Sequence, residues 1–434
     1  MNHGDTIVAI SSAVGESARI IVRLSGSRAR DIVDKLSGRA SGFGGTPTVI
    51  SLQLRVDALT FAAHAYVFYA PHSYTGEDLV ELHLPGNPLL ARMTLSACQQ
   101  AGARLADPGE FTARAYFNGR LDLTEAEGVA ATIAAHGEAE LAAARQLLAG
   151  ELSRRLVPIM DLLADTLALV EVGIDFVDEE VTFLPAEELR ERLTRADGML
   201  AEIQSTSGRF ERLSHEPRVV LVGPPNAGKS TLLNALAGHD RAVVSPIAGT
   251  TRDVLSATVF LRRGAIQLID VAGFDSDSGR TRSDVHSQMQ TRAKQAMESA
   301  DVVVGVQEPG TAEDASITAD LRVNTKADLH PHVPGDGIFV SAVTGQGLAE
   351  LRDRLDELAF GAQSPGASLA LTSRHLQAIE TARLALARAL ERGESSEVLA
   401  MELRESLDAL GQILGVIAPD DLLGRIFSAF CIGK

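Results

Sequence analysis

The chain has 434 residues, which is long enough for about two to four domains and for more than one hydrophobic core. Its formal net charge of -17 argues against a broad surface that coats nucleic acid, although a local basic site stays open. Two cysteines, the lack of a secretory leader and the lack of an apolar run near about 20 residues predict a soluble cytoplasmic protein with no membrane span.

Residues 1–118 predict a compact α+β domain, because short strand patterns alternate with clusters of Gly, Ser and Pro. Two loops, SYTGED at 73–78 and DPGEF at 107–111, are rich in acceptor groups, and each is more typical of a turn than of a site. The predicted strands are Thr6 to Ile10, Arg19 to Arg23, Ala65 to Tyr69 and Leu79 to Leu84, with a helix over Leu89 to Gln100.

Long helices rich in Ala, Leu and Glu follow from Thr124 and return after Arg374. Apolar residues recur there every three or four positions, which predicts amphipathic helices. Neither segment alone has enough apolar faces for a bundle, so we expect residues 119–210 and 370–434 to pack as one helical domain. The stripes are Leu148, Leu152, Leu156, Ile159, Leu163, Leu167 and Val170 on one helix bent at Pro158, then Leu376, Ile379, Leu386 and Leu390, then Leu399, Leu403, Leu407, Leu410 and Leu414.

Residues 217–361 lie between these helical segments and alternate between strand and helix patterns. Alternation of this kind predicts an α/β domain with a parallel sheet, helices on both faces, and ligand sites at the carboxyl ends of the strands. We therefore expect it to be inserted into the helical domain, with its two ends close together. The predicted strands are Val219 to Val222, Leu268 to Asp270, Val302 to Val306, Leu321 to Asn324 and Ile338 to Val340, and the last helix carries Leu348, Leu351, Leu355 and Leu358.

The strongest motif is Gly223-x4-Gly228-Lys229-Ser230, which follows the first of these strands and opens a helix. Its glycines let backbone N–H groups turn toward a phosphate, while Lys229 and Ser230 supply a cation and a Mg²⁺ ligand. The chain uses 35 Arg and only 5 Lys, so the lysines at 229, 326 and 434 mark places where a compact ammonium cannot be exchanged for a planar guanidinium. The motif predicts a nucleotide phosphate site.

Further motifs follow in the order that a GTPase requires. The polar loop GTTRD at 249–253 offers a threonine hydroxyl for Mg²⁺, and Asp270 of DVAG places a carboxylate behind the metal. Asp328 of TKAD could accept the N1 and N2 protons of guanine, a donor pair that adenine lacks. Ser341-Ala342 could present an amide to the base oxygen. Together these motifs predict GTP as the nucleotide.

These motifs resemble one family over nearly the whole chain. The phosphate loop with Asn226, the GTTRD loop, DFVDEE at 175–180, SYTGED, DPGEF and the C-terminal LLGRIFSAFCIGK are similar to the bacterial tRNA modification GTPases called MnmE or TrmE. The resemblance implies a tetrahydrofolate-binding and dimerising domain at 1–118, before the helical domain that carries the inserted GTPase domain. It also implies tRNA as substrate and a heterotetramer or larger complex with the FAD-dependent protein MnmG, also called GidA. That complex places an aminomethyl or carboxymethylaminomethyl group on C5 of the wobble uridine.

The resemblance also implies roles for particular residues. Arg23, Glu81, Arg120 and Lys434 match positions that bind 5-formyl- or 5,10-methylene-tetrahydrofolate, and Cys431 matches a cysteine near them, although a small buried hydrophobe fits that residue equally well. Ser230 and Thr251 match Mg²⁺ ligands, whereas Asn226, Ser245, Ile247 and Thr250 match a K⁺ site that replaces an arginine finger. The residues expected to bind GTP are Asn226, Ala227, Gly228, Lys229, Ser230, Thr231, Ser245, Pro246, Ile247, Ala248, Gly249, Thr250, Thr251, Asp270, Val271, Ala272, Gly273, Thr325, Lys326, Asp328, Ser341 and Ala342.

The chain also departs from the family pattern. Val271 replaces a threonine, Thr325 an asparagine and Val343 a lysine, and Gln307-Glu308-Pro309 stands in place of a strand ending in Asp-Gly. His286 falls at the position of the glutamate that orients the attacking water, after an insertion around residues 275–280, and with Thr251 it is the candidate catalytic residue. Two functions therefore stay open: a K⁺-dependent GTPase, or a hydrolytically weak scaffold that carries folate. Asp328 disfavours an ATPase.

Overall fold

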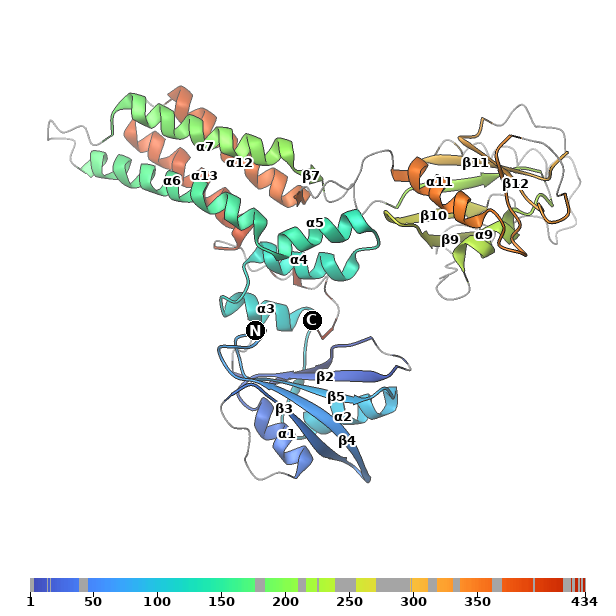
Figure 1. Cartoon of the computed structure of the whole chain (residues 1–434). Coiled ribbons are helices and arrows are strands. Elements are labelled where there is room, and N and C mark those ends of the chain that lie inside the picture. The colour runs from blue at the N-terminus through green and yellow to red at the C-terminus, as the bar shows by residue number, and fades with distance from the viewer. Residues whose placement is uncertain are drawn as a thin grey trace, which may run out of the picture. The chain divides into compact units, whose positions relative to one another are not determined.

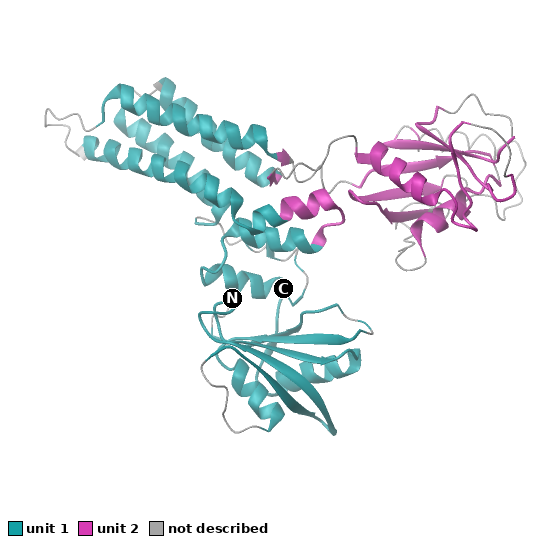
Figure 2. Ribbon diagram, viewed as in Figure 1, with its two compact units in different colours: residues 1–133, 145–207, 373–434 teal, residues 134–144, 208–372 magenta. Residues whose placement is uncertain are grey.

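The structure is a computed structural model of the chain, and it divides into two compact units (Figure 1, Figure 2). Unit 1 comprises residues 1–133, 145–207 and 373–434, and unit 2 comprises residues 134–144 and 208–372. The residues that the structure describes are 4–13, 15, 17–38, 46–175, 184–209, 216–224, 226–238, 255–270, 297, 299–310, 318–330, 336–360, 369–392, 395–416, 423, 426–427, 430 and 432–433.

The N-terminal sheet of unit 1 has six strands in the order β3-β4-β5-β2-β1-β6. Its neighbouring strands are antiparallel, except that β1 and β6 are parallel. The mixture of strands and packed helices is the α+β arrangement predicted for this segment. The elements are β1 (Ile7–Ile10), β2 (Arg19–Ser25), α1 (Ala29–Ser37), β3 (Thr48–Val56), β4 (Leu59–Phe68), β5 (Leu79–Pro85), α2 (Pro88–Gln100) and β6 (Arg104–Leu105).

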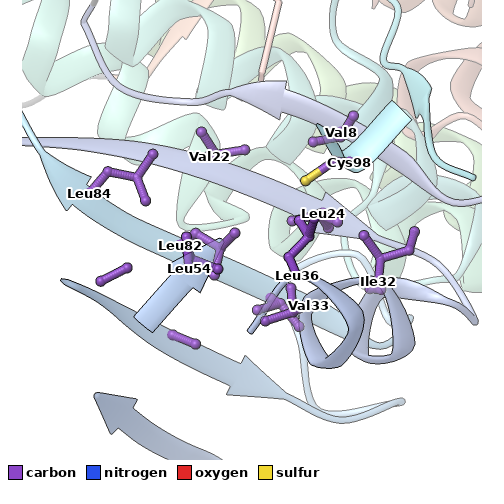
Figure 3. Close-up of a cluster of buried hydrophobic side chains, with 14 of the residues drawn as sticks. Val8, Val22, Leu24, Ile32, Val33, Leu36, Leu54, Leu82, Leu84 and Cys98 are labelled. Carbon is purple, nitrogen blue, oxygen red and sulfur yellow. The ribbon is translucent and has the colours of Figure 1, made fainter. Parts of the chain in front are cut away.

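One face of this sheet is apolar and is covered by α1 and α2 (Figure 3). Val22 and Leu24 of β2 are fully buried in this core, together with Val33 of α1 and Cys98 of α2. Because side chains alternate along a strand, Arg23 lies on the opposite face, where its register partner on β5 is Glu81. The second face of the sheet therefore carries polar groups next to one another.

The predicted strands of this domain are present, but β3 and α1 were not predicted. β3 is an edge strand whose first half is the more exposed, while Leu52, Leu54 and Val56 in its second half are buried and alternate with exposed residues. α2 begins at Pro88 because the side chain of Asn87 accepts hydrogen bonds from the amides of Leu89 and Leu90.

Four long helices of unit 1 pack side by side: α6 against α7 and α13, and α12 against α7 and α13 (Figure 1). Each buries one apolar stripe, as for Leu156 of α6 and Leu403 of α13. The helices of this part are α3 (Glu110–Phe117), α4 (Leu123–Ala134), α6 (Glu151–Asp175), α7 (Ala186–Thr206), α12 (Ser373–Arg392) and α13 (Ser396–Leu414). Helix α5 (Glu138–Leu148) begins in unit 2 and ends in unit 1, and unit 2 also contains β7 (Gly208–Arg209), which pairs in parallel with β14 (Ala370–Leu371).

The prediction that the stripe beginning at Leu148 lies on one helix is wrong. Leu148 ends α5, and α6 starts at Glu151. Gly150 separates them with a left-handed φ of 72°, and its amide donates to the carbonyl oxygen of Leu147. The stripe crosses this helix end because Leu148 and Leu152 are four residues apart, a spacing that also occurs within one helix.

The sheet of unit 2 has the strand order β13-β12-β11-β8-β10-β9. Five of its strands run parallel, as predicted, whereas β9 adds an antiparallel edge strand beside β10. The elements are β8 (Arg218–Val222), α9 (Lys229–Ala237), β9 (Leu255–Phe260), β10 (Ala265–Asp270), β11 (Val302–Gln307), β12 (Leu321–Asn324), β13 (Ile338–Phe339) and α11 (Leu348–Phe360).

Both faces of this sheet are buried. Val219 and Leu221 belong to a core shared with α9 and α11, whereas Val220 and Val222 belong to a smaller cluster on the opposite face. Residues 271–296 lie outside the described part of the chain. Burial on both faces explains why β8 reads as a continuous apolar run.

Among the described helices, none has the length and apolar character needed to cross a membrane.

Candidate nucleotide site

The phosphate loop joins β8 to α9, and its backbone depends on residues that tolerate unusual geometry. Gly223 has a φ of 152°, and a Cβ there would lie 1.9 Å from the carbonyl oxygen of Val306. Asn226 and Gly228 adopt left-handed conformations with φ of 59° and 86°. Helix α9 begins directly afterwards at Lys229, so its N-terminal end adjoins the loop. This backbone is suited to cradle an anion.

Lys229 is the cation of this cradle. The residue is only 4% exposed, and its Nζ donates to the carbonyl oxygens of Gly223 at 2.9 Å and Pro224 at 2.7 Å. A buried ammonium needs such oxygen partners, because it has lost most of its water. These contacts hold the positive charge against the loop backbone, beside the N-terminus of α9.

Ser230 and Asp270 form the second polar pair of the site. Asp270 is fully buried at the end of β10, which pairs in parallel with β8, and Ser230 Oγ donates to Asp270 Oδ2 at 2.5 Å. A hydroxyl and a carboxylate are oxygen donors of the kind that Mg²⁺ prefers. No cluster of three or more His, Cys, Asp or Glu side chains suited to a metal occurs in the described part of the chain.

Thr325 ties the phosphate loop to the loop after β12. Its Oγ1 lies 2.5 Å from the carbonyl oxygen of Ala227 and 3.2 Å from that of Gln307, and its amide donates to the same Gln307 oxygen at 2.9 Å. Thr325 is 5% exposed, so these are interior contacts. The residue that departs from the family pattern thus bridges the phosphate loop and the end of β11.

The loop after β12 carries Lys326 and Asp328. Lys326 has a left-handed φ of 54°, and its Nζ lies 2.6 Å from Glu308 Oε2. His330 Nε2 lies 2.9 Å from the other oxygen of Glu308, and hydrogen bonds from Lys326 and His330 hold the pKa of this carboxyl below its usual range. Asp328 is exposed between these two contacts, so its carboxylate is accessible to a ligand.

Ser341 and Ala342 follow β13 and lie next to the Asp328 loop, because the amide of Ala327 donates to the carbonyl oxygen of Val340 at 3.1 Å. Ser341 is fully buried, and its own amide already donates to the Gln346 carbonyl. Of the two amides predicted to reach the base, that of Ala342 is therefore the better placed.

The structure thus brings together the phosphate loop, Asp270, the 325–328 segment and the residues after β13 at one edge of the sheet. The remaining predicted site residues of unit 2 lie outside the described part of the chain. They are Ser245, Pro246, Ile247, Ala248, Gly249, Thr250, Thr251, Val271, Ala272, Gly273 and His286.

In unit 1, Arg23 and Glu81 are paired across β2 and β5, with Arg23 Nη2 at 2.7 Å from Glu81 Oε1. The Arg23 guanidinium also lies over the rings of Tyr74 and Phe111, at 5.8 Å and 5.6 Å from their centroids. Arg23 Nη1 donates to the carbonyl oxygen of Gly433 at 3.5 Å. The C-terminal end of the chain therefore reaches this pair.

Of the other residues in the predicted folate site, only Arg120 belongs to the described part of the chain. Lys434 and Cys431 lie outside the described residues, although a β-bridge joins Ile432 to Pro108 of the DPGEF loop. Arg120 is exposed just beyond the end of α3, where its amide donates to the carbonyl oxygen of Ala115.

The SYTGED and DPGEF loops meet in a buried ionic network that the sequence did not predict. Arg114, 4% exposed, contacts Glu77 at 3.0 Å, Glu110 at 3.0 Å and Asp5 at 2.7 Å, and Arg104 contacts Glu110 at 2.6 Å. Burial by itself would raise the pKa of Glu110, but hydrogen bonds from Arg104 and Arg114 outweigh it, so this pKa lies below its usual value. Both loops therefore have a structural role, but the last two residues of DPGEF, Glu110 and Phe111, begin α3 and do not belong to a turn.

The site contains two residues whose roles the sequence did not indicate. The bridging hydroxyl of Thr325 and the double contact of Glu308 both depend on residues about 20 to 100 positions away in the chain. The sequence placed Thr325 in the TKAD motif but did not indicate its contact with the phosphate loop, and it assigned no role to Glu308. A phosphate loop at the end of a central parallel strand, a buried carboxylate on the next strand and an Asp-bearing loop at the base position define a phosphate-loop GTPase.

Comparison with known proteins gives the family. The model described as "GTP-binding protein TrmE N-terminus" matches residues 6–120, and that described as "MnmE helical domain" matches residues 123–431. The tRNA modification GTPase MnmE of Xanthomonas campestris pv. campestris is 40% identical, with 99% of each chain covered. That of Aquifex aeolicus is 36% identical, with 99% of this chain and 100% of the relative covered. The chain therefore belongs to the MnmE family of tRNA modification GTPases.

Among solved structures, the G domain of the T. maritima FeoB iron transporter is 26% identical to this chain. The match covers 33% of this chain and 99% of the FeoB chain, with a TM-score of 0.25.

Proposed function

We propose that unit 2 binds GTP at the carboxyl edge of its sheet and hydrolyses it to GDP and phosphate. The observation that carries this proposal is the contact of Ser230 with the buried Asp270, beside the buried Lys229. Backbone amides of the loop and the N-terminus of α9 would bind the phosphates, and Lys229 would neutralise part of their charge.

Magnesium and potassium are the proposed cofactors of this reaction. The oxygen donors of Ser230 and Asp270 suit Mg²⁺, with Thr251 as a second direct ligand and Asp270 behind the ion. We assign K⁺ to Asn226, Ser245, Ile247 and Thr250. Both cations, when bound, neutralise negative charge on the phosphates. For the attacking water we propose His286 as the orienting group.

Guanine is the proposed base. The exposed carboxylate of Asp328 would accept the N1 and N2 protons, and the amide of Ala342 would donate to the base oxygen. Adenine presents the reverse pattern of donor and acceptor at those positions, so the same loop would reject ATP.

We further propose that GTP hydrolysis serves modification of tRNA at C5 of the wobble uridine, in the cytoplasm. The N-terminal domain would bind a one-carbon tetrahydrofolate near Arg23 and Glu81, with Arg120 and Lys434, and would form a homodimer. Paired acidic and basic side chains on one sheet face, beside aromatic rings, fit a ligand with polar edges and a flat ring. The FAD-dependent MnmG is the proposed partner.

The decisive experiment measures GTP turnover by the full chain in K⁺ and in equal Na⁺, with ATP as the control nucleotide. We expect turnover with GTP that is faster in K⁺, and none with ATP. Lys229→Ala should lose nucleotide binding while keeping its fold, because it removes a charge from the cradle. GTP binding without turnover in either salt would instead support the hydrolytically weak, folate-carrying scaffold.

A further inference from the structure

Glu308 makes two contacts across the loop that carries Asp328. It follows β11 directly, at the carboxyl end of the sheet. One carboxylate oxygen lies 2.6 Å from Lys326 Nζ, and the other lies 2.9 Å from His330 Nε2. Lys326 and His330 are two residues before and two residues after Asp328, so the two contacts of Glu308 span the residue proposed to read the base.

The backbone anchors the start and the middle of this loop, but its polar tip depends on side chains. The amide of Thr325 donates to Gln307 at 2.9 Å, and that of Ala327 donates to Val340 at 3.1 Å. Beyond Ala327 two backbone hydrogen bonds are local: the amide of Leu329 donates to Lys326, and that of His330 donates to Ala327. The side chain of Glu308 adds contacts that join this turn to the end of β11.

The conformation of Lys326 adds to this argument. Its φ of 54° lies in the left-handed region, which L-residues other than Asn and Asp seldom adopt. The ion pair with Glu308 forms with the Lys326 backbone in this conformation, so it favours that conformation over alternatives that would break the contact.

We propose that Glu308 is a positioning residue for base recognition: it holds both flanks of the 326–330 turn so that the Asp328 carboxylate faces the base edge. This inference rests on the proposed function, because it assumes that Asp328 reads guanine. It adds a residue outside the TKAD motif to the determinants of nucleotide specificity. Glu308 touches neither substrate nor metal in this role.

The effect should fall on base discrimination and not on chemistry. The side chains of Glu308 and Lys326 are 32% and 34% exposed, so water screens part of their attraction. We therefore expect Glu308→Ala to lower the preference for GDP over IDP by about 3- to 10-fold. IDP is the informative probe. Its base keeps the N1 proton but lacks the 2-amino group, from which the Asp328 carboxylate would accept a hydrogen bond.

The experiment measures the dissociation constants of fluorescent GDP and IDP with the full chain, together with kcat for GTP. The parent should prefer GDP by about 10-fold or more. Glu308→Ala should reduce this ratio and leave kcat at saturating GTP within about twofold of the parent. Glu308→Gln keeps the shape and one acceptor, so it should retain part of the preference, and it keeps the test available if the alanine variant does not fold.

The matched control is Glu357→Ala, which removes an exposed ion pair with Arg354 on α11 of the same unit and should leave the ratio unchanged. Asp328→Asn is measured in the same way and should abolish the preference for GDP over IDP. If Asp328→Asn keeps this preference, Asp328 does not recognise the base, and the role proposed for Glu308 is refuted as well. If Asp328→Asn loses the preference and both Glu308 variants keep it, only the role of Glu308 is refuted.

Discussion

Replacing Thr325 by valine would keep the shape of a buried side chain and remove one hydroxyl. Its Oγ1 has a single proton, and the contact of 2.5 Å with the Ala227 carbonyl oxygen is shorter than the 3.2 Å contact with that of Gln307. The Gln307 oxygen keeps the amide of residue 325 at 2.9 Å, so the loss falls mainly on Ala227. Removing one partner of a buried hydrogen bond costs about 1–2 kcal/mol, or about 5- to 30-fold in an equilibrium constant.

Because Ala227 belongs to the phosphate loop, part of this loss should appear as weaker nucleotide binding. We expect Thr325→Val to raise the dissociation constant of GDP by about 5- to 10-fold, the lower part of that range, measured by fluorescence titration of the full chain. Thr325→Ser keeps the hydroxyl and is the matched control, and it should stay within about threefold of the parent. Binding by the valine variant as tight as that of the serine variant would refute the bridging role of this hydroxyl.

Three further predictions concern other parts of the chain. Gly223→Ala should abolish nucleotide binding and lower the thermal stability of unit 2, because its Cβ would lie 1.9 Å from the Val306 carbonyl oxygen; full binding would contradict this loop geometry. Burial would raise the pKa of Glu127, but the hydrogen bond from His375 at 2.7 Å and the charge of Arg374 lower it below 4.5. The ionised Glu127 therefore stabilises the fold fully above pH 4.5, and this stabilisation is lost as pH falls through the lower pKa of the folded state. Glu127→Gln should lower the melting temperature at pH 7, and the difference in melting temperature from the parent should be smaller in acid. If His286 orients the attacking water, turnover should fall as pH drops through about 6.5, and His286→Ala should remove both the activity and this dependence; equal turnover by the variant from pH 5.5 to 8 would end that assignment.

Several elements of the site could be predicted from local sequence. The run from Val219 to Val222 is apolar at every position because the strand is buried on both faces, and the glycine-rich loop must follow it for the motif to work. Lys229 and Asp270 can therefore be assigned from their motifs alone, and both residues are buried in the structure. Such assignments are possible where each motif consists of residues that are close together along the chain.

Other features were missed because no local pattern encodes them. β9 is an antiparallel edge strand, and its identity depends on pairing with β10. The break at Gly150 is hidden because Leu148 and Leu152, on either side of it, keep the four-residue spacing of a single helix. The ionic network around Arg114 joins loops more than 30 residues apart, so the sequence showed only two acceptor-rich turns.

By itself the sequence determined the class of nucleotide site, the order of its motifs and the family, since these depend on residue identity and on short spacings. Only the tertiary structure decided how the site is held together: Thr325 reaches Ala227, and Glu308 reaches both Lys326 and His330. Those contacts arise because parallel strands bring the ends of β8, β11 and β12 to one edge of the sheet. Strand order is a property of long-range pairing, which residue spacing along a single chain does not specify.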